Sequence, residues 1–150
     1  MTRRPVMPSP RPEWLKIKVP APEVVNEVMD LIRSKALVTV CQEARCPNMG
    51  ECWGGGTATI MLMGEVCTRG CKFCNVKTGN PKGVLDPLEP EKVAFSISQM
   101  SLEYVVLTSV DRDDLPDQGA SHFSRTIRTI KKLDSHVIVE VLTPDFRGDL

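Results

Sequence analysis

Three cysteines lie close together at Cys67, Cys71 and Cys74, with three and then two residues between them. A cubane iron–sulfur cluster has four irons, and each iron takes one outer ligand, usually a cysteine thiolate. Three thiolates therefore leave one iron without a protein ligand. Because an open coordination position distinguishes a reactive metal site from a closed structural one, the triplet predicts a cluster that takes part in chemistry.

Two other interpretations of this triplet stay open. Cysteine is often buried in protein cores, but Gly64 and Gly70 disfavour the helix that would place the three thiols on one face. Arg69 and Lys72 lie between the thiols and favour the thiolate form. A zinc site is the stronger rival, because zinc also takes cysteine ligands.

A second triplet precedes the first, with spacings of four and five residues: Cys41, Cys46 and Cys52. Pro47, Gly50 and the run 54–56 predict a loop that can bend around a metal centre. The three glycines lack the lysine and hydroxyl of a phosphate-binding loop, so the sequence does not favour nucleotide binding. The two triplets contain all 6 cysteines of the chain, which argues against an accidental grouping.

Composition excludes several classes of function. The 19 basic and 19 acidic residues balance, so no basic field predicts nucleic-acid binding and no acidic field predicts a cationic partner. No apolar run reaches the roughly 18 residues that a membrane span needs, and the start of the chain fits neither a secretory signal nor a transit peptide. We therefore expect the cytoplasm, where clustered cysteines bind metal or act in catalysis more often than they form disulfides.

The rest of the chain alternates between helix and strand patterns. Residues 1–22 hold half of the 12 prolines and predict an extended arm, and residues 22–35 predict an amphipathic helix. Strands are expected over 57–63, 104–110 and 137–142, and helices over 90–101 and 121–133. This order indicates right-handed βαβ crossovers and a parallel sheet, hence an α/β fold.

Reactive groups in parallel sheets gather at the carboxyl ends of the strands. The cysteine loop follows the first strand, residues 108–119 close and follow the second, and residues 143–147 follow the third. We expect these three segments to lie on one rim of the sheet. The acidic second segment does not fit a calcium loop, because Leu115 stands where an oxygen ligand is needed. His122 and His136 are predicted at a helix surface and a strand end.

The Cys67, Cys71 and Cys74 spacing resembles the signature of the radical S-adenosylmethionine superfamily. The resemblance implies that the open iron binds the amino and carboxylate groups of S-adenosylmethionine, and that Phe73 lies beside the adenine. One electron from the cluster would then release a 5′-deoxyadenosyl radical. Three polar residues of the second strand and its loop are expected to hydrogen-bond the ammonium or ribose of the cofactor: Ser109, Asp111 and Asp113.

Both triplets together resemble the lipoyl synthase family within that superfamily. The matching segments are Glu43-Ala44-Arg45-Cys46-Pro47-Asn48, Glu51-Cys52-Trp53, Thr68-Arg69-Gly70-Cys71, Phe73-Cys74-Asn75-Val76, Thr108-Ser109-Val110-Asp111-Arg112-Asp113-Asp114-Leu115-Pro116-Asp117 and Thr143-Pro144-Asp145-Phe146-Arg147-Gly148. The resemblance implies two [4Fe-4S] clusters, one on each triplet, with Cys41, Cys46 and Cys52 holding an auxiliary cluster whose sulfides are consumed. It also implies a partial (β/α) barrel of about three β/α units over residues 57–150, preceded by an N-terminal extension over residues 1–56.

The reaction implied by the resemblance is insertion of two sulfur atoms, at C6 and C8 of an octanoyl group attached to a lysine of a lipoyl carrier domain. Such a carrier would be a glycine cleavage H protein or a dehydrogenase E2 type. Other implied partners are an electron donor such as ferredoxin or flavodoxin and the iron–sulfur assembly proteins, with no nucleic acid and no membrane.

The sequence departs from the family because it contains no Arg-Ser-Ser motif, whose serine is the fourth ligand of the auxiliary cluster. Three strands do not close a barrel, which takes eight. We expect either a partial sequence or a second polypeptide that supplies the rest. The alternatives are an inactive or complemented fragment, a structural zinc-binding module, or a different radical enzyme.

Overall fold

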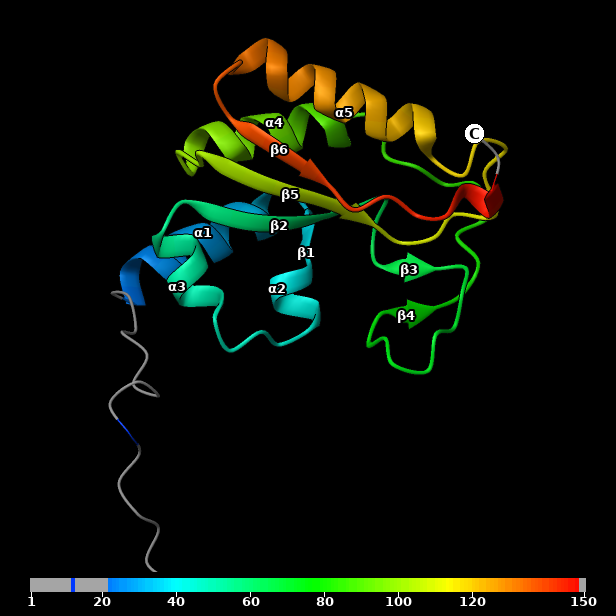
Figure 1. Ribbon diagram of the computed structural model, residues 1–150, viewed down its shortest axis with the longest axis horizontal. Helices are drawn as coiled ribbons and strands as arrows, with labels where there is room; N and C mark the ends of the chain where they lie inside the picture. The colour runs from blue at the N-terminus through cyan, green and yellow to red at the C-terminus, as the bar shows by residue number, and fades with distance from the viewer. Residues whose placement is uncertain (1–11, 13–21, 149–150) are drawn as a thin grey trace, which may run out of the picture.

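The computed structural model describes residue 12 and residues 22–148. A four-stranded sheet runs through the molecule (Figure 1), in the spatial order β1 (Val38–Thr39), β2 (Thr57–Leu62), β5 (Tyr104–Ser109) and β6 (Ile138–Val141). The strands β2, β5 and β6 are parallel, and β1 runs antiparallel to β2 at the edge. This arrangement confirms the predicted α/β fold with a largely parallel sheet.

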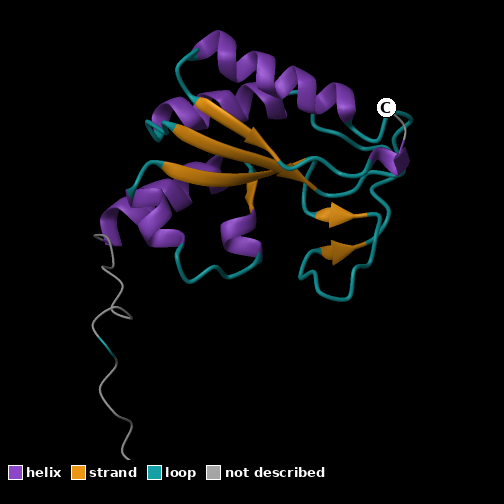
Figure 2. Cartoon of the chain, viewed as in Figure 1, coloured by secondary structure: helices purple, strands orange, loops and turns teal. Residues whose placement is uncertain are grey.

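Two helices, α4 (Glu89–Gln99) and α5 (Ala120–Leu133), lie side by side on one face of the sheet (Figure 2). Each helix connects two parallel strands. Buried residues alternate with half-buried ones over the first four residues of β2, and the last three residues of the strand are all buried. Ala58, Ile60 and Leu62 belong to the same apolar core as Ile97 of α4 and Ile130 of α5. The period of two places one face of the strand against the helices, as expected for a β/α unit.

The predicted element boundaries agree with the structure to within two residues at each end. The first helix, α1 (Pro22–Ser34), begins with proline and has Glu23 in its first turn and Arg33 in its last, which suits the helix dipole. The predicted extended arm before it lies outside the described residues. Among the residues that are described, no helix is long and apolar enough to cross a membrane.

The prediction of a loop over residues 41–52 is wrong. Two short helices form there, α2 (Val40–Glu43) and α3 (Met49–Gly54). Thr39 starts the first of them, because its Oγ1 accepts a hydrogen bond from the backbone N–H of Gln42 at 3.2 Å. The strand β1 immediately before α2 pairs with β2, so the segment up to residue 56 contributes to the main sheet. The division at residue 56 stays a prediction.

A second, small sheet was not predicted. It consists of β3 (Val66–Cys67) and β4 (Lys77–Thr78), which pair in parallel. Strands of two residues are too short to produce a recognisable alternation in the sequence. The pairing brings the two ends of the cysteine loop together, and Gly79 extends it by donating its N–H to the carbonyl oxygen of Cys67 at 2.9 Å.

Candidate metal centre

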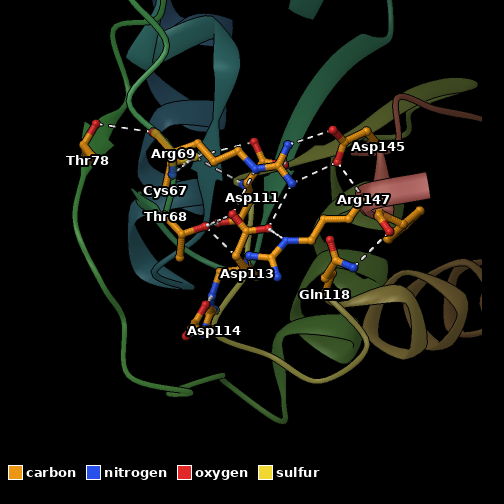
Figure 3. A network of polar contacts seen from close by, with 12 residues as sticks. Cys67, Thr68, Arg69, Thr78, Asp111, Asp113, Asp114, Gln118, Asp145 and Arg147 are labelled. Atoms are coloured by element: carbon orange, nitrogen blue, oxygen red, sulfur yellow. Dashed lines mark hydrogen bonds and ion pairs between the residues drawn. The ribbon is translucent and has the colours of Figure 1, made fainter. Parts of the chain in front are cut away.

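Arg69, between the first two cysteines of the loop, connects the three segments that follow β2, β5 and β6 (Figure 3). Its Nε and Nη2 donate to the carboxylate of Asp113, both at 2.9 Å. Its Nη1 and Nη2 donate to the carboxylate of Asp145, again both at 2.9 Å. The contacts confirm that the three polar segments meet on one rim of the sheet.

The carboxylate of Asp113 accepts hydrogen bonds from residues of both neighbouring loops. Besides Arg69, it accepts hydrogen bonds from Thr68 Oγ1 at 3.0 Å and from Arg147 Nε at 3.0 Å. The hydrogen bonds from Arg69 are the main reason that the pKa of Asp113 lies well below its usual range. The same hydrogen bonds to Asp113 raise the pKa of the Arg69 guanidinium. The expected contact between Asp113 and the cofactor stays a prediction.

Cys67 is buried and its sulfur already has hydrogen-bond donors. Its Sγ accepts the backbone N–H of Asp111 at 3.3 Å and that of Arg69 at 3.4 Å. The thiol lies 3.8 Å from Asp111 Oδ2, which is therefore placed beside the predicted cluster ligand. Hydrogen bonds of this kind to a cysteine sulfur tune the potential of an iron–sulfur cluster that the cysteine binds.

The other two cysteines of the loop are exposed. The N–H of Cys74 donates to the carbonyl oxygen of Cys71 at 3.0 Å, which forms a turn between them. Phe73, within that turn, has 93% of its surface exposed. Within residues 22–148, no three Cys, His, Asp or Glu side chains converge as ligands of one metal ion. The three thiols fit a cluster by their donor chemistry, and their assembly around it stays a prediction.

The second triplet is spread over α2, α3 and the turn between them. Cys41 is buried, Cys46 is half-buried and Cys52 is exposed. The pKa of the Cys52 thiol is raised. The main cause is desolvation by burial, and smaller contributions come from the nearby groups of Cys41, Cys46 and Glu51. Cys41 and Cys46 therefore lie near Cys52, and this set also suits an iron–sulfur cluster by its chemistry.

The two cysteine segments lie next to each other. The side-chain amide of Asn75, directly after Cys74, donates to the carbonyl oxygen of Glu43 in α2 at 2.8 Å. A cavity of about 360 Å³ opens between the segments. The cavity is largely apolar. Its apolar lining residues come from α2 and the residue after it, from β2 and from the cysteine loop: Val40, Ala44, Met61, Phe73 and Val76.

Ser109 stands at the end of β5, on the same rim. Its Oγ is buried and has no hydrogen-bond partner in the described part of the chain. A buried hydroxyl without a partner is costly, so this atom fits the neighbourhood of a polar ligand. The observation supports the predicted contact between Ser109 and a cofactor without establishing it.

Arg112 is a buried residue near the site that the sequence did not single out. Its side chain is 1% exposed, and its Nε and Nη2 donate to the carboxylate of Asp114, both at 2.9 Å. Its Nη1 donates to the carbonyl oxygen of Met63 at 3.2 Å. The contact with Arg112 lowers the pKa of Asp114 to about 2. The position of this arginine among acidic residues was the feature of the sequence that could have pointed to it.

The prediction that His122 lies on a helix surface is wrong. The residue is 6% exposed, and its Nε2 lies 2.6 Å from Glu89 Oε2 of the neighbouring helix. His122, Thr126 and Ile130 form a buried row at intervals of four residues, which faces α4. The spacing was visible in the sequence, but the burial of this row depends on the packing of α4 against α5. His136 is exposed just before β6, as predicted.

Comparisons with known proteins agree with this geometry. The Radical SAM superfamily profile matches residues 61–150. A lipoyl synthase of Thermus thermophilus is 58% identical over 140 residues, covering 93% of this chain and 43% of the relative. A lipoyl synthase of Anaeromyxobacter dehalogenans is 56% identical over 143 residues, covering 95% and 48%. A mitochondrial lipoyl synthase of Danio rerio is 57% identical over 144 residues, covering 93% and 36%.

The chain spans less than half the length of these relatives. The superfamily profile, by contrast, covers more than half of the chain, from the end of β2 through the loop with three cysteines to β5 and β6. From the fold, the rim of polar loops and this match, we conclude that the chain belongs to the radical SAM superfamily.

Proposed function

We propose that this chain is part of a lipoyl synthase, which inserts two sulfur atoms at C6 and C8 of an octanoyl group attached to a lysine of a lipoyl carrier domain. The observation that carries the proposal is the close approach of the two cysteine segments, joined by Asn75 and Glu43 and separated by an apolar cavity. Its context is the 56 to 58% identity to relatives named lipoyl synthase.

The first role of the chain is to hold two [4Fe-4S] clusters. Cys67, Cys71 and Cys74 would bind one of them and leave an iron open for S-adenosylmethionine. This cluster and cofactor would supply the reductive cleavage of the sulfonium, which yields a radical that removes hydrogen from unactivated carbon. A second set of thiols would hold the auxiliary cluster that donates sulfur: Cys41, Cys46 and Cys52.

The cavity suits an acyl chain in size and in polarity. Its volume of about 360 Å³ falls in the range of small-molecule pockets, which is on the order of 300 to 1,000 Å³. Its apolar lining suits a hydrocarbon chain, and because it lies between the two cysteine segments, we expect both of them to face one substrate. A phosphorylated or otherwise charged small molecule would find few polar partners there.

The remaining partners follow from this chemistry. A reduced cluster requires a one-electron donor of the ferredoxin or flavodoxin type, and assembly of the clusters requires iron–sulfur assembly proteins. The substrate would be a carrier domain of the H-protein or E2 type that carries octanoyl-lysine. We propose the cytoplasm as the location, in line with the cysteine chemistry.

The test is a chimera that joins residues 1–150 to the part of the Thermus thermophilus relative that follows its matched segment. The reconstituted chimera is incubated without oxygen with S-adenosylmethionine, dithionite and a peptide that contains octanoyl-lysine. We expect 5′-deoxyadenosine and a peptide that has gained two sulfur atoms, both measured by mass spectrometry. Release of 5′-deoxyadenosine without sulfur insertion, or a protein that binds zinc in place of iron, would contradict the proposal.

A further inference from the structure

Met63 joins β2 to the cysteine loop in an unusual backbone conformation. Its φ is 67°, in the left-handed region that residues other than glycine rarely adopt. The residue is 4% exposed and stands four positions before Cys67. The cysteine loop starts at Met63. The direction of the backbone at this residue therefore determines where the loop and Cys67 lie. A conformation of this kind persists only where the surroundings hold it in place.

Two buried side chains hold the backbone of Met63. The carboxylate of Glu89 accepts the Met63 N–H, with Oε1 at 3.1 Å and Oε2 at 2.9 Å. On the other side, Arg112 donates from Nη1 to the Met63 carbonyl oxygen. Glu89 is only 7% exposed, and it is the first residue of α4, where the helix dipole favours a carboxylate.

His122 completes the arrangement from α5. Its Nε2 faces Glu89 Oε2 at 2.6 Å, so the ring donates to the oxygen that also accepts the Met63 N–H. A buried carboxylate needs such partners, because an unpaired buried charge is strongly unfavourable. The pair thus links α4 and α5 to the backbone at the end of β2. Neither residue belongs to the predicted cluster ligands.

We propose that the buried Glu89–His122 pair positions the cluster-binding loop by holding the backbone of Met63. This inference rests on the proposed cluster site at Cys67, Cys71 and Cys74. Both residues act through Met63 and not by contact with the cofactor. Loss of either one should leave the three thiols in place but release the point from which the loop starts.

The first measurement is hydrogen exchange of the Met63 amide in the 150-residue chain, resolved by NMR or by fragmentation mass spectrometry. Glu89→Ala should speed exchange at Met63 by about tenfold or more, because it removes both acceptors of that N–H. Glu89→Gln keeps one acceptor oxygen and should give a smaller increase. Glu91→Ala is the matched control: it lies on the same helix, pairs with exposed Arg125, and should leave Met63 unchanged.

The second measurement follows the electron paramagnetic resonance spectrum of the reduced cluster during titration with S-adenosylmethionine. Glu89→Ala and His122→Ala should retain iron but need about tenfold more cofactor for the half-maximal spectral change, since a misplaced loop binds it less well. Spectra are recorded at a temperature at which each variant is folded. A purely structural role predicts a lower melting temperature with an unchanged titration, and that result would overturn the proposal.

The two measurements separate this inference from the proposed function. A parent chain that binds no iron would contradict the cluster site, while amide exchange would still show whether Glu89 holds Met63. A parent chain that binds the cluster, but whose Met63 amide exchanges freely, would leave the proposed function intact and refute the positioning pair. Slow exchange in the parent that persists in Glu89→Ala would refute it as well.

Discussion

The guanidinium of Arg69 and the carboxylate of Asp113 form two parallel hydrogen bonds, Nε to Oδ2 and Nη2 to Oδ1, each 2.9 Å long. The pair joins the cysteine loop after β2 to the loop after β5, across 44 residues of sequence. Arg69 stands two residues after one predicted cluster ligand and two before the next. The geometry of the loop therefore depends on carboxylates supplied by other β/α units (Figure 3).

Replacing Arg69 should loosen the cysteine loop. Arg69→Ala leaves Asp113 and Asp145 without their main partner, and we expect a loss of about 2 kcal/mol of unfolding free energy. Arg69→Lys should recover only part of this loss, because lysine cannot form paired hydrogen bonds to two carboxylates. Urea unfolding measures the effect, and iron retained after gel filtration reports on the loop. Arg125→Ala, which breaks an exposed ion pair, is the control and should change neither quantity.

Gly119→Ala should be destabilising for two separable reasons. Gly119 has a φ of 91°, and a Cβ there would lie 2.2 Å from Met63 Sδ. Gly83→Ala is the matched variant, since Gly83 has a φ of 73° and nothing within 4 Å of the added carbon. We expect a loss of about 1 kcal/mol for Gly83→Ala from backbone strain alone, and about 2 to 4 kcal/mol for Gly119→Ala from strain plus overpacking. Equal losses would show that Met63 does not pack on Gly119.

Asp114 should make stability depend on pH in the acid range. Its pKa is about 2 in the folded chain, below its ordinary value of 3.8, because of Arg112. A lowered pKa stabilises the folded state above the ordinary pKa, and that contribution disappears as the pH falls through the folded one. Asp114→Asn should therefore be less stable than the parent by roughly 2 kcal/mol at pH 7. The difference should shrink between about pH 4 and pH 2, as measured by urea unfolding at several pH values.

Iron analysis should distinguish the two cysteine triplets from a zinc module. We expect the anaerobically reconstituted chain to be brown, with broad absorption near roughly 400 nm and up to about eight irons. Replacing all three cysteines of one triplet by alanine should remove about half of the iron, whichever triplet is chosen. Zinc without iron in the reconstituted protein would contradict the cluster assignment for both.

Single cysteine replacements should separate the roles of the triplets in the chimera. Cys74→Ala removes a ligand of the cluster proposed to reduce S-adenosylmethionine, so both 5′-deoxyadenosine and sulfur-containing product should fall below detection. Cys52→Ala damages only the proposed sulfur donor, so 5′-deoxyadenosine should persist while the octanoyl chain gains no sulfur. Mass spectrometry quantifies both products. Lipoyl product from Cys52→Ala at the parent rate would show that the auxiliary cluster is not the donor.

The sequence by itself predicted the radical SAM superfamily and the order of the main helices and strands. Cysteine spacing is local, and so are the alternation of β2 and β5 and the apolar stripes of α1 and α5, which is why their boundaries were predicted to within two residues. The meeting of the three rim loops also followed from the sequence, because parallel strands must place their carboxyl ends on one edge.

Only the tertiary structure decided which polar side chains pair across elements. Arg112 and Asp114 are two residues apart in an acidic segment, and nothing local showed that Arg112 would reach the carbonyl oxygen of Met63. Glu89 and His122 each resemble surface residues until α4 packs on α5 and buries both. Burial and partner choice depend on how whole elements pack, so spacing along the chain does not specify them. The short strands β3 and β4 escaped prediction for a related reason, since their stability comes from pairing with each other.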